Sequence, residues 1–165
     1  FEDNGPQILN IMIGYNRDKA DGTRLALPTI SFTDKYVINL GNLVIEALYL
    51  GPAHSPGDIS VWIPSKKLVI AGDMAFHERL LPIFSHTNTK EWIATWDNEF
   101  EKLNPIYVIP GHGHPTNMDQ VRKYTRNYLV YLREKIGTFI ESGGELKDAY
   151  YVDQPHFLIF KLLRN

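Results

Sequence analysis

The sequence predicts an α/β fold in which a mostly antiparallel or mixed sheet carries helices on one face. In the first half of the 165 residues, paired apolar runs flank tight turn signals, as in β-hairpins. In the second half, apolar residues recur at helical spacing. A short, wholly apolar run separates the two helix-like segments and is typical of a buried strand. We expect one domain over residues 1–165, a length that allows a sizeable core.

The first half is expected to hold one short helix and two hairpins. The turn signals are Gly41-Asn42 and Pro64-Ser65-Lys66. The arm that follows Gly41-Asn42 is longer and more apolar than the arm before it, so it is predicted to be more central in the sheet. The expected elements are a helix over 7–15, a hairpin over 35–40 and 43–50, and a hairpin over 59–63 and 67–71.

The second half is expected to be largely helical. Trp92, Trp96 and Phe100 recur at helical spacing, and Asn88 precedes them as a capping residue. A second capping residue, Asn117, begins a long helix that ends at glycines, the usual terminators. The expected elements are a helix over 89–103, a strand over 106–109, a helix from 118 to about 141 and a terminal helix over 155–163.

Composition narrows the function classes. The net charge of −2 gives no electrostatic basis for binding nucleic acid or an anionic membrane. No apolar run approaches the length of a membrane span. The absence of cysteine excludes disulfides, thiolate zinc sites and a cysteine nucleophile. Because the sequence opens with Phe1 in mid-pattern, we expect a fragment or processed product, and the compartment stays open between cytoplasm and periplasm.

Three side chains that can bind metals each follow an apolar run, in loops rich in glycine or proline. They are His54, Asp73 and His112. Neutral imidazole and carboxylate suit zinc or another first-row divalent ion. Structural roles are the alternative: His54 would hydrogen-bond a turn, and Asp73 would cap the segment that follows it. For His112, between two glycines, the structural alternative is weaker.

The stretches that carry these residues, GPAHSPGD, IAGDMAF and VIPGHG, resemble the second half of the metallo-β-lactamase-fold hydrolases. Their order and spacing fit, with 73 − 54 = 19 and 112 − 73 = 39 residues between them. The resemblance covers roughly residues 27–132 and implies half of a four-layer αβ/βα sandwich. The first signature of that family, H-x-H-x-D-H, is absent from these 165 residues.

The resemblance implies a metal-dependent hydrolase. In the intact protein two zinc ions would be held by His54 and His112, with Asp73 as the bridging, catalytic carboxylate. A metal-bound hydroxide would attack an ester, thioester, amide or lactam, or phosphoester. Three ligands shared between two ions give each ion only two, fewer than the usual three. This chain alone is therefore expected to be inactive, or to bind metal weakly by recruiting another group such as His77 or His114. The alternative is a metal-free binding or scaffold module that keeps the fold.

Two further expectations concern the surroundings of the site. His77 and His86 are expected to line the mouth for a small-molecule substrate, unless their loop is simply solvated. A half-sandwich would leave one sheet face apolar and exposed. That face is expected to pack on the missing N-terminal half or on a second copy of the chain.

Overall fold

A computed structural model describes residues 5–152. The chain divides into two compact units, Phe1–Thr33 and Asp34–Asn165, and each is described by itself. The first unit contains the predicted helix, α1 (Gly5–Asn16), followed by the 3-10 turn η1 (Arg17–Ala20). The single-domain prediction stays a prediction, and the terminal helix expected over 155–163 lies outside the described residues. Among residues 5–152, no helix has the length and apolarity that crossing a membrane requires.

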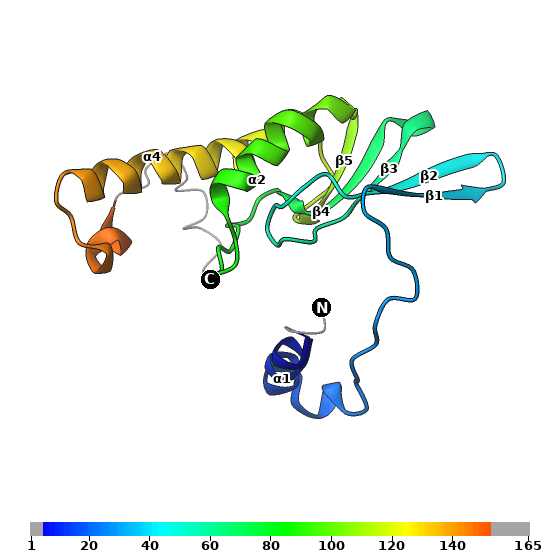
Figure 1. Cartoon of the computed structure of the whole chain (residues 1–165), viewed down its shortest axis with the longest axis horizontal. Helices are drawn as coiled ribbons and strands as arrows, with labels where there is room; N and C mark the ends of the chain where they lie inside the picture. The colour runs from blue at the N-terminus through cyan, green and yellow to red at the C-terminus, as the bar shows by residue number, and fades with distance from the viewer. Residues whose placement is uncertain (1–4, 153–165) are drawn as a thin grey trace. The chain divides into compact units, whose positions relative to one another are not determined.

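The second unit is built on one mixed sheet with the order β1-β2-β3-β4-β5 (Figure 1). Neighbouring strands are antiparallel except for β4 and β5, which run parallel. Both predicted hairpins are confirmed, and β2 lies inside β1 as expected. The strands are β1 (Lys35–Leu40), β2 (Leu43–Leu48), β3 (Ser60–Ile63), β4 (Leu68–Phe76) and β5 (Tyr107–His112), with the 3-10 turn η2 (Pro64–Lys66) between β3 and β4.

The strands β4 and β5 are longer than predicted, and the expectation that Asp73 and His112 lie in loops was wrong. Gly72, with φ +57°, marks a register shift after which pairing continues, so that Phe76 lies opposite His112. The side chains of Asp73 and His112 therefore project from strands. The prediction missed this because β4 pairs with a strand that is distant in the sequence. The glycines that suggested loops instead allow the irregular register between β4 and β5.

The helices follow the predicted order, with two turns of unexpected geometry. Asn88 accepts hydrogen bonds from the amides of Lys90 and Glu91, and Asn117 accepts one from Gln120, which confirms both caps. Gly143, with φ +91°, follows the end of the long helix. The segments are α2 (Thr89–Thr95), π-helical η3 (Trp96–Phe100), η4 (Glu101–Leu103), α3 (Met118–Val121), π-helical η5 (Arg122–Arg126), α4 (Asn127–Glu141) and η6 (Leu146–Tyr151).

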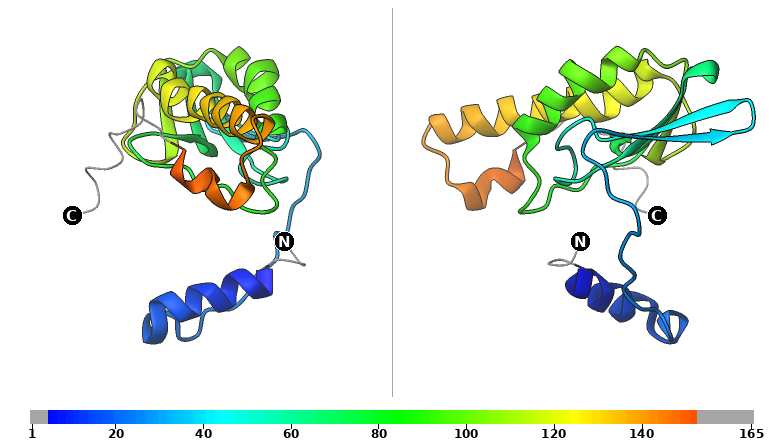
Figure 2. Two further views of the ribbon diagram at one scale, coloured as in Figure 1. Left: turned by 90° about the vertical axis from the view of Figure 1, so that its left-hand side faces the viewer. Right: turned by 45° about the vertical axis from the view of Figure 1, so that its right-hand side comes forward.

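The helices cover one face of the sheet, which confirms the predicted α/β fold class. In Figures 1 and 2, α2 and α4 lie side by side against the strands. The core contains Val69, Ala71 and Val108 from the strands, packed with Trp92 and Trp96 from the helical layer. All five side chains are fully buried, so this face supplies most of the unit's hydrophobic stabilisation.

Candidate metal centre

The three predicted metal ligands meet at one edge of the sheet. The Nε2 atom of His54 lies 3.8 Å from Oδ2 of Asp73, and Nε2 of His112 lies 3.5 Å from Oδ1 of the same carboxylate. The His54 side chain is largely buried at 11% exposure, whereas that of His112 is 40% exposed. One carboxylate therefore stands between two imidazoles and presents a different oxygen to each.

These separations fit ligands that share metal ions better than they fit hydrogen bonds. N–H···O bonds are usually 2.7–3.2 Å long. Two ligands bound at 2.0–2.1 Å to one tetrahedral zinc stand about 3.3 Å apart. Nδ1 of His54 is buried and has no hydrogen-bond partner among residues 5–152. Within residues 5–152, no group of three or more His, Asp or Glu side chains surrounds a single point closely enough to hold an ion.

The loop that carries His54 is braced from both sides. The carboxylate of Asp58 accepts hydrogen bonds from the amide and the hydroxyl of Ser55. The Thr95 hydroxyl donates to the Pro52 carbonyl at 2.8 Å, and the Thr87 hydroxyl donates to the His54 carbonyl at 2.7 Å. The backbone on either side of the imidazole is therefore tied to the segment that contains α2.

Aromatic rings enclose the two imidazoles. The ring centroids of Phe76, Phe84 and Trp92 lie 5.9, 5.3 and 5.8 Å from that of His54. The ring of Phe76 also stacks on His112, with centroids 5.0 Å apart and planes at 19°. These rings restrict the orientation of both imidazoles and create an apolar surrounding, in which a nearby charge is screened less than in water.

Two glycines allow β5 to approach β4 at this edge. A Cβ atom on Gly111 would collide with the Asp73 carboxylate and with the backbone of Gly72. A Cβ atom on Gly113, which has φ +92°, would collide with the backbone carbonyl of His77. The glycines flanking His112 therefore make room for neighbouring backbone and for Asp73.

The ring of His77, which was expected at the substrate mouth, contacts residues outside the three predicted ligands. The Nδ1 atom of His77 lies 3.0 Å from the His114 carbonyl oxygen, and its ring meets Tyr124 edge-on. The exposed His114 pairs with Glu78, with 2.5 Å between Nδ1 and Oε2. The hydrogen bond between them lowers the pKa of Glu78 and raises the pKa of His114.

The structure places the predicted residue His86 and shows two residues, Phe84 and Thr125, that the sequence interpretation overlooked. His86, predicted at the substrate mouth, is exposed and stacks on Phe84, whose ring in turn meets His54. The fully buried Thr125 binds Phe76 through its hydroxyl. No local pattern signals these contacts, because the residues that Thr125 and Phe84 contact lie 49 and 30 positions away in the sequence, as 125 − 76 and 84 − 54 show.

Comparisons with known protein families and known proteins agree on one family. The sequence profile of the Metallo-beta-lactamase superfamily matches residues 14–114. A metallo-beta-lactamase type 2 of Bacteroides fragilis is 30% identical over 99 residues, which are 58% of this chain and 40% of that protein. The human acyl-coenzyme A thioesterase MBLAC2 is 24% identical over 117 residues, which are 68% of this chain and 42% of that protein. The chain thus spans about two fifths of the length of these relatives.

Solved structures show the same fold. A metallo-beta-lactamase from Pontibacter korlensis superposes with a TM-score of 0.57 at 17% identity, over 73% of this chain and 54% of that one. The DIM-1 metallo-beta-lactamase gives a TM-score of 0.51 at 22% identity, over 60% of this chain and 45% of that one.

Proposed function

The chain belongs to the metallo-beta-lactamase superfamily, a superfamily of metal-dependent hydrolases, and from this membership we propose that it forms part of a zinc-dependent hydrolase. His54 and His112 would each hold one ion, and Asp73 would bridge the two. The reaction proposed is hydrolysis of an ester, a thioester, an amide or lactam, or a phosphoester. Catalytic zinc usually has three protein ligands, so ligands beyond these three side chains complete the site in this proposal.

One observation supports this function above all others. The two imidazoles face different oxygens of one carboxylate, at separations of 3.8 and 3.5 Å. Asp73 supplies the negative charge that offsets two cations, and its position in β4 fixes that charge between the histidines. When bound, zinc supplies a Lewis acid that polarises the scissile bond and lowers the pKa of bound water. The surrounding rings of Phe76, Phe84 and Trp92 limit the access of bulk water to His54.

Zinc content tests the ligand assignment without requiring turnover. We would measure bound zinc by elemental analysis on the natural protein that contains this chain and on His54→Ala, His112→Ala and Asp73→Asn variants. Each variant should lose zinc, and Asp73→Asn should lose the most because both ions share that carboxylate. His86→Ala is the matched control, since that exposed imidazole stacks on Phe84. Zinc content unchanged in all three variants would refute the ligand assignment, and an unmodified protein that holds no zinc would favour a metal-free binding or scaffold module instead.

The face of the sheet opposite the helices is the surface on which this chain is expected to pack against a partner. Side chains on the face opposite the helices, here called the outer face, lie in two rows that run across the strands. The rows are Tyr36, Ala47, Val61, Ile70 and Ile109, and Ile38, Ile45, Ile63, Leu68 and Tyr107. All ten residues are apolar or aromatic, and none is buried. Uncovered apolar surface on this scale marks an interaction site.

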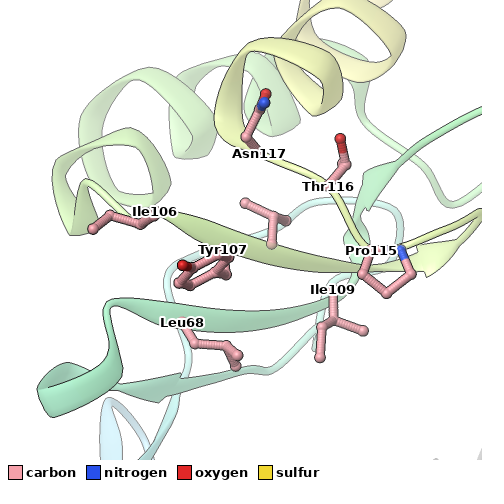
Figure 3. Close-up of a pocket in the computed structure, with 8 residues that line it drawn as sticks. Leu68, Ile106, Tyr107, Ile109, Pro115, Thr116 and Asn117 are labelled. Carbon is pink, nitrogen blue, oxygen red and sulfur yellow. The ribbon is translucent and has the colours of Figure 1, made fainter.

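Figure 3 shows one end of this face, where Leu68, Tyr107 and Ile109 help to line an open cavity of about 480 Å³. In the working protein, we propose, the outer face is covered either by the remainder of the fold or by a second copy of the chain. Light scattering separates these possibilities for the isolated chain. A concentration-dependent dimer indicates the second copy, and a stable, soluble monomer contradicts both.

A further inference from the structure

The loop between β4 and α2 exposes three apolar side chains, one of which contacts the candidate metal centre. Leu80, Ile83 and Phe84 are all exposed, and the Phe84 side chain is 51% accessible. Single exposed apolar residues are ordinary on protein surfaces. Here three lie within five positions of sequence, and the ring of one of them, Phe84, contacts His54. We call these three residues the apolar lip.

Hydrogen bonds hold Phe84 in place. The Thr87 hydroxyl accepts a hydrogen bond from the Phe84 amide at 3.2 Å and donates one to the His54 carbonyl at 2.7 Å. The Thr87 amide in turn donates to the Phe84 carbonyl at 3.0 Å. Within the same stretch, Leu81 lies between Leu80 and Ile83 and is buried in the core. The lip is therefore pinned both to the core and to the backbone of a candidate ligand.

Phe84 is also the accessible member of the aromatic group around His54. The rings of Phe76 and Trp92 are fully buried, whereas Phe84 meets His54 edge-on at 5.3 Å and keeps half of its surface in contact with solvent. A ligand that reaches the candidate metal centre from the side of Phe84 meets an aromatic surface. Covering that surface with hydrocarbon is favourable because apolar area leaves water.

We propose that the apolar lip binds the acyl group of the substrate, so that the substrate is an ester or thioester with a hydrocarbon acyl chain. This inference rests on the proposed hydrolase function and narrows it. A phosphoester would instead call for arginine, lysine or backbone N–H donors around its oxygens. The accessible ring beside His54 is that of Phe84, which suits hydrocarbon.

Chain-length dependence of binding tests the acyl site without turnover. The probes are non-hydrolysable thioethers of N-acetylcysteamine with four-, six- and eight-carbon alkyl chains, and binding is measured by calorimetry on the natural protein. Full burial strengthens binding about fourfold per methylene, so contact on one side should give about twofold. The dissociation constant should therefore fall about fourfold for every two carbons added.

Variants locate the binding surface. Phe84→Ser should remove most of the chain-length dependence, whereas Phe84→Leu should keep it. Ile106→Ser is the matched control, because Ile106 is similarly exposed and lines the separate cavity of Figure 3. Melting temperatures of all variants check that each one folds.

Two results would overturn the acyl site: affinity independent of chain length in the unmodified protein, or a chain-length dependence that Phe84→Ser preserves. Zinc content measured on the same samples tests the metal assignment separately. A protein that binds zinc through His54 and His112 but shows either result would refute the lip and leave the hydrolase proposal standing.

Discussion

Replacing Thr125 with valine should destabilise the sheet edge that carries the candidate metal centre. Thr125 is fully buried in η5, where its hydroxyl accepts a hydrogen bond from the Phe76 amide at 2.8 Å and donates one to the Phe76 carbonyl at 3.1 Å. Valine keeps the shape but loses both bonds. Each buried polar group left without a partner costs about 1–3 kcal/mol, so losing the partner of both the Phe76 amide and the Phe76 carbonyl should lower the free energy of unfolding by about 2–6 kcal/mol.

Urea denaturation followed by tryptophan fluorescence measures this loss, with an unchanged m-value as the sign of a pure stability effect. Thr125→Ser is the control, since it keeps the hydroxyl and removes one methyl group, at a cost of about 1 kcal/mol. A valine variant as stable as the serine variant would refute the reasoning, because the hydroxyl would then contribute nothing.

Two other predictions follow from backbone crowding and from burial. Gly111→Ala should lower the free energy of unfolding by about 1–3 kcal/mol and weaken zinc binding, because the new methyl group meets Asp73 and the Gly72 backbone. Gly57→Ala is the control, since a methyl group added there meets no atom within 4 Å. It should leave both the zinc content and the urea midpoint unchanged. Burial raises the pKa of Tyr128 above its ordinary value of 10.0, so its contribution to stability is present below pH 10 and is lost as the pH rises through the raised pKa. Urea midpoints between pH 8 and 11 should therefore fall more steeply for the unmodified chain than for Tyr128→Phe, and equal slopes would contradict this assignment.

Local signals in the sequence predicted most of the elements. The turn Gly41-Asn42 and the caps Asn88 and Asn117 act within a few residues of themselves, and the structure confirms the elements that they delimit. The π-helical turns escaped prediction because their apolar spacing is close to that of an α-helix. Element boundaries failed where pairing between distant strands decided them, as at Asp73 in β4.

The candidate site was predictable in its residues but not in its surroundings. His54, Asp73 and His112 stood out because each follows an apolar run, and the structure brings the three together. Phe84 and Thr125 did not stand out, since one lies in an irregular loop and the other on a helix without a motif. Their importance comes from tertiary contacts, and a single sequence does not encode those contacts in any local pattern.

The bond between Thr125 and Phe76 also affects how the chain folds. The strands β4 and β5 are parallel, so their pairing requires a crossover through α2, and Thr125 joins β4 only after η5 has docked as well. Contacts between residues far apart in the sequence cost chain entropy before they gain interaction energy, so they tend to form late in folding. We therefore expect the hairpins to form first and the metal-binding edge to assemble last, so that substitutions at Thr125 accelerate unfolding while leaving the refolding rate nearly constant.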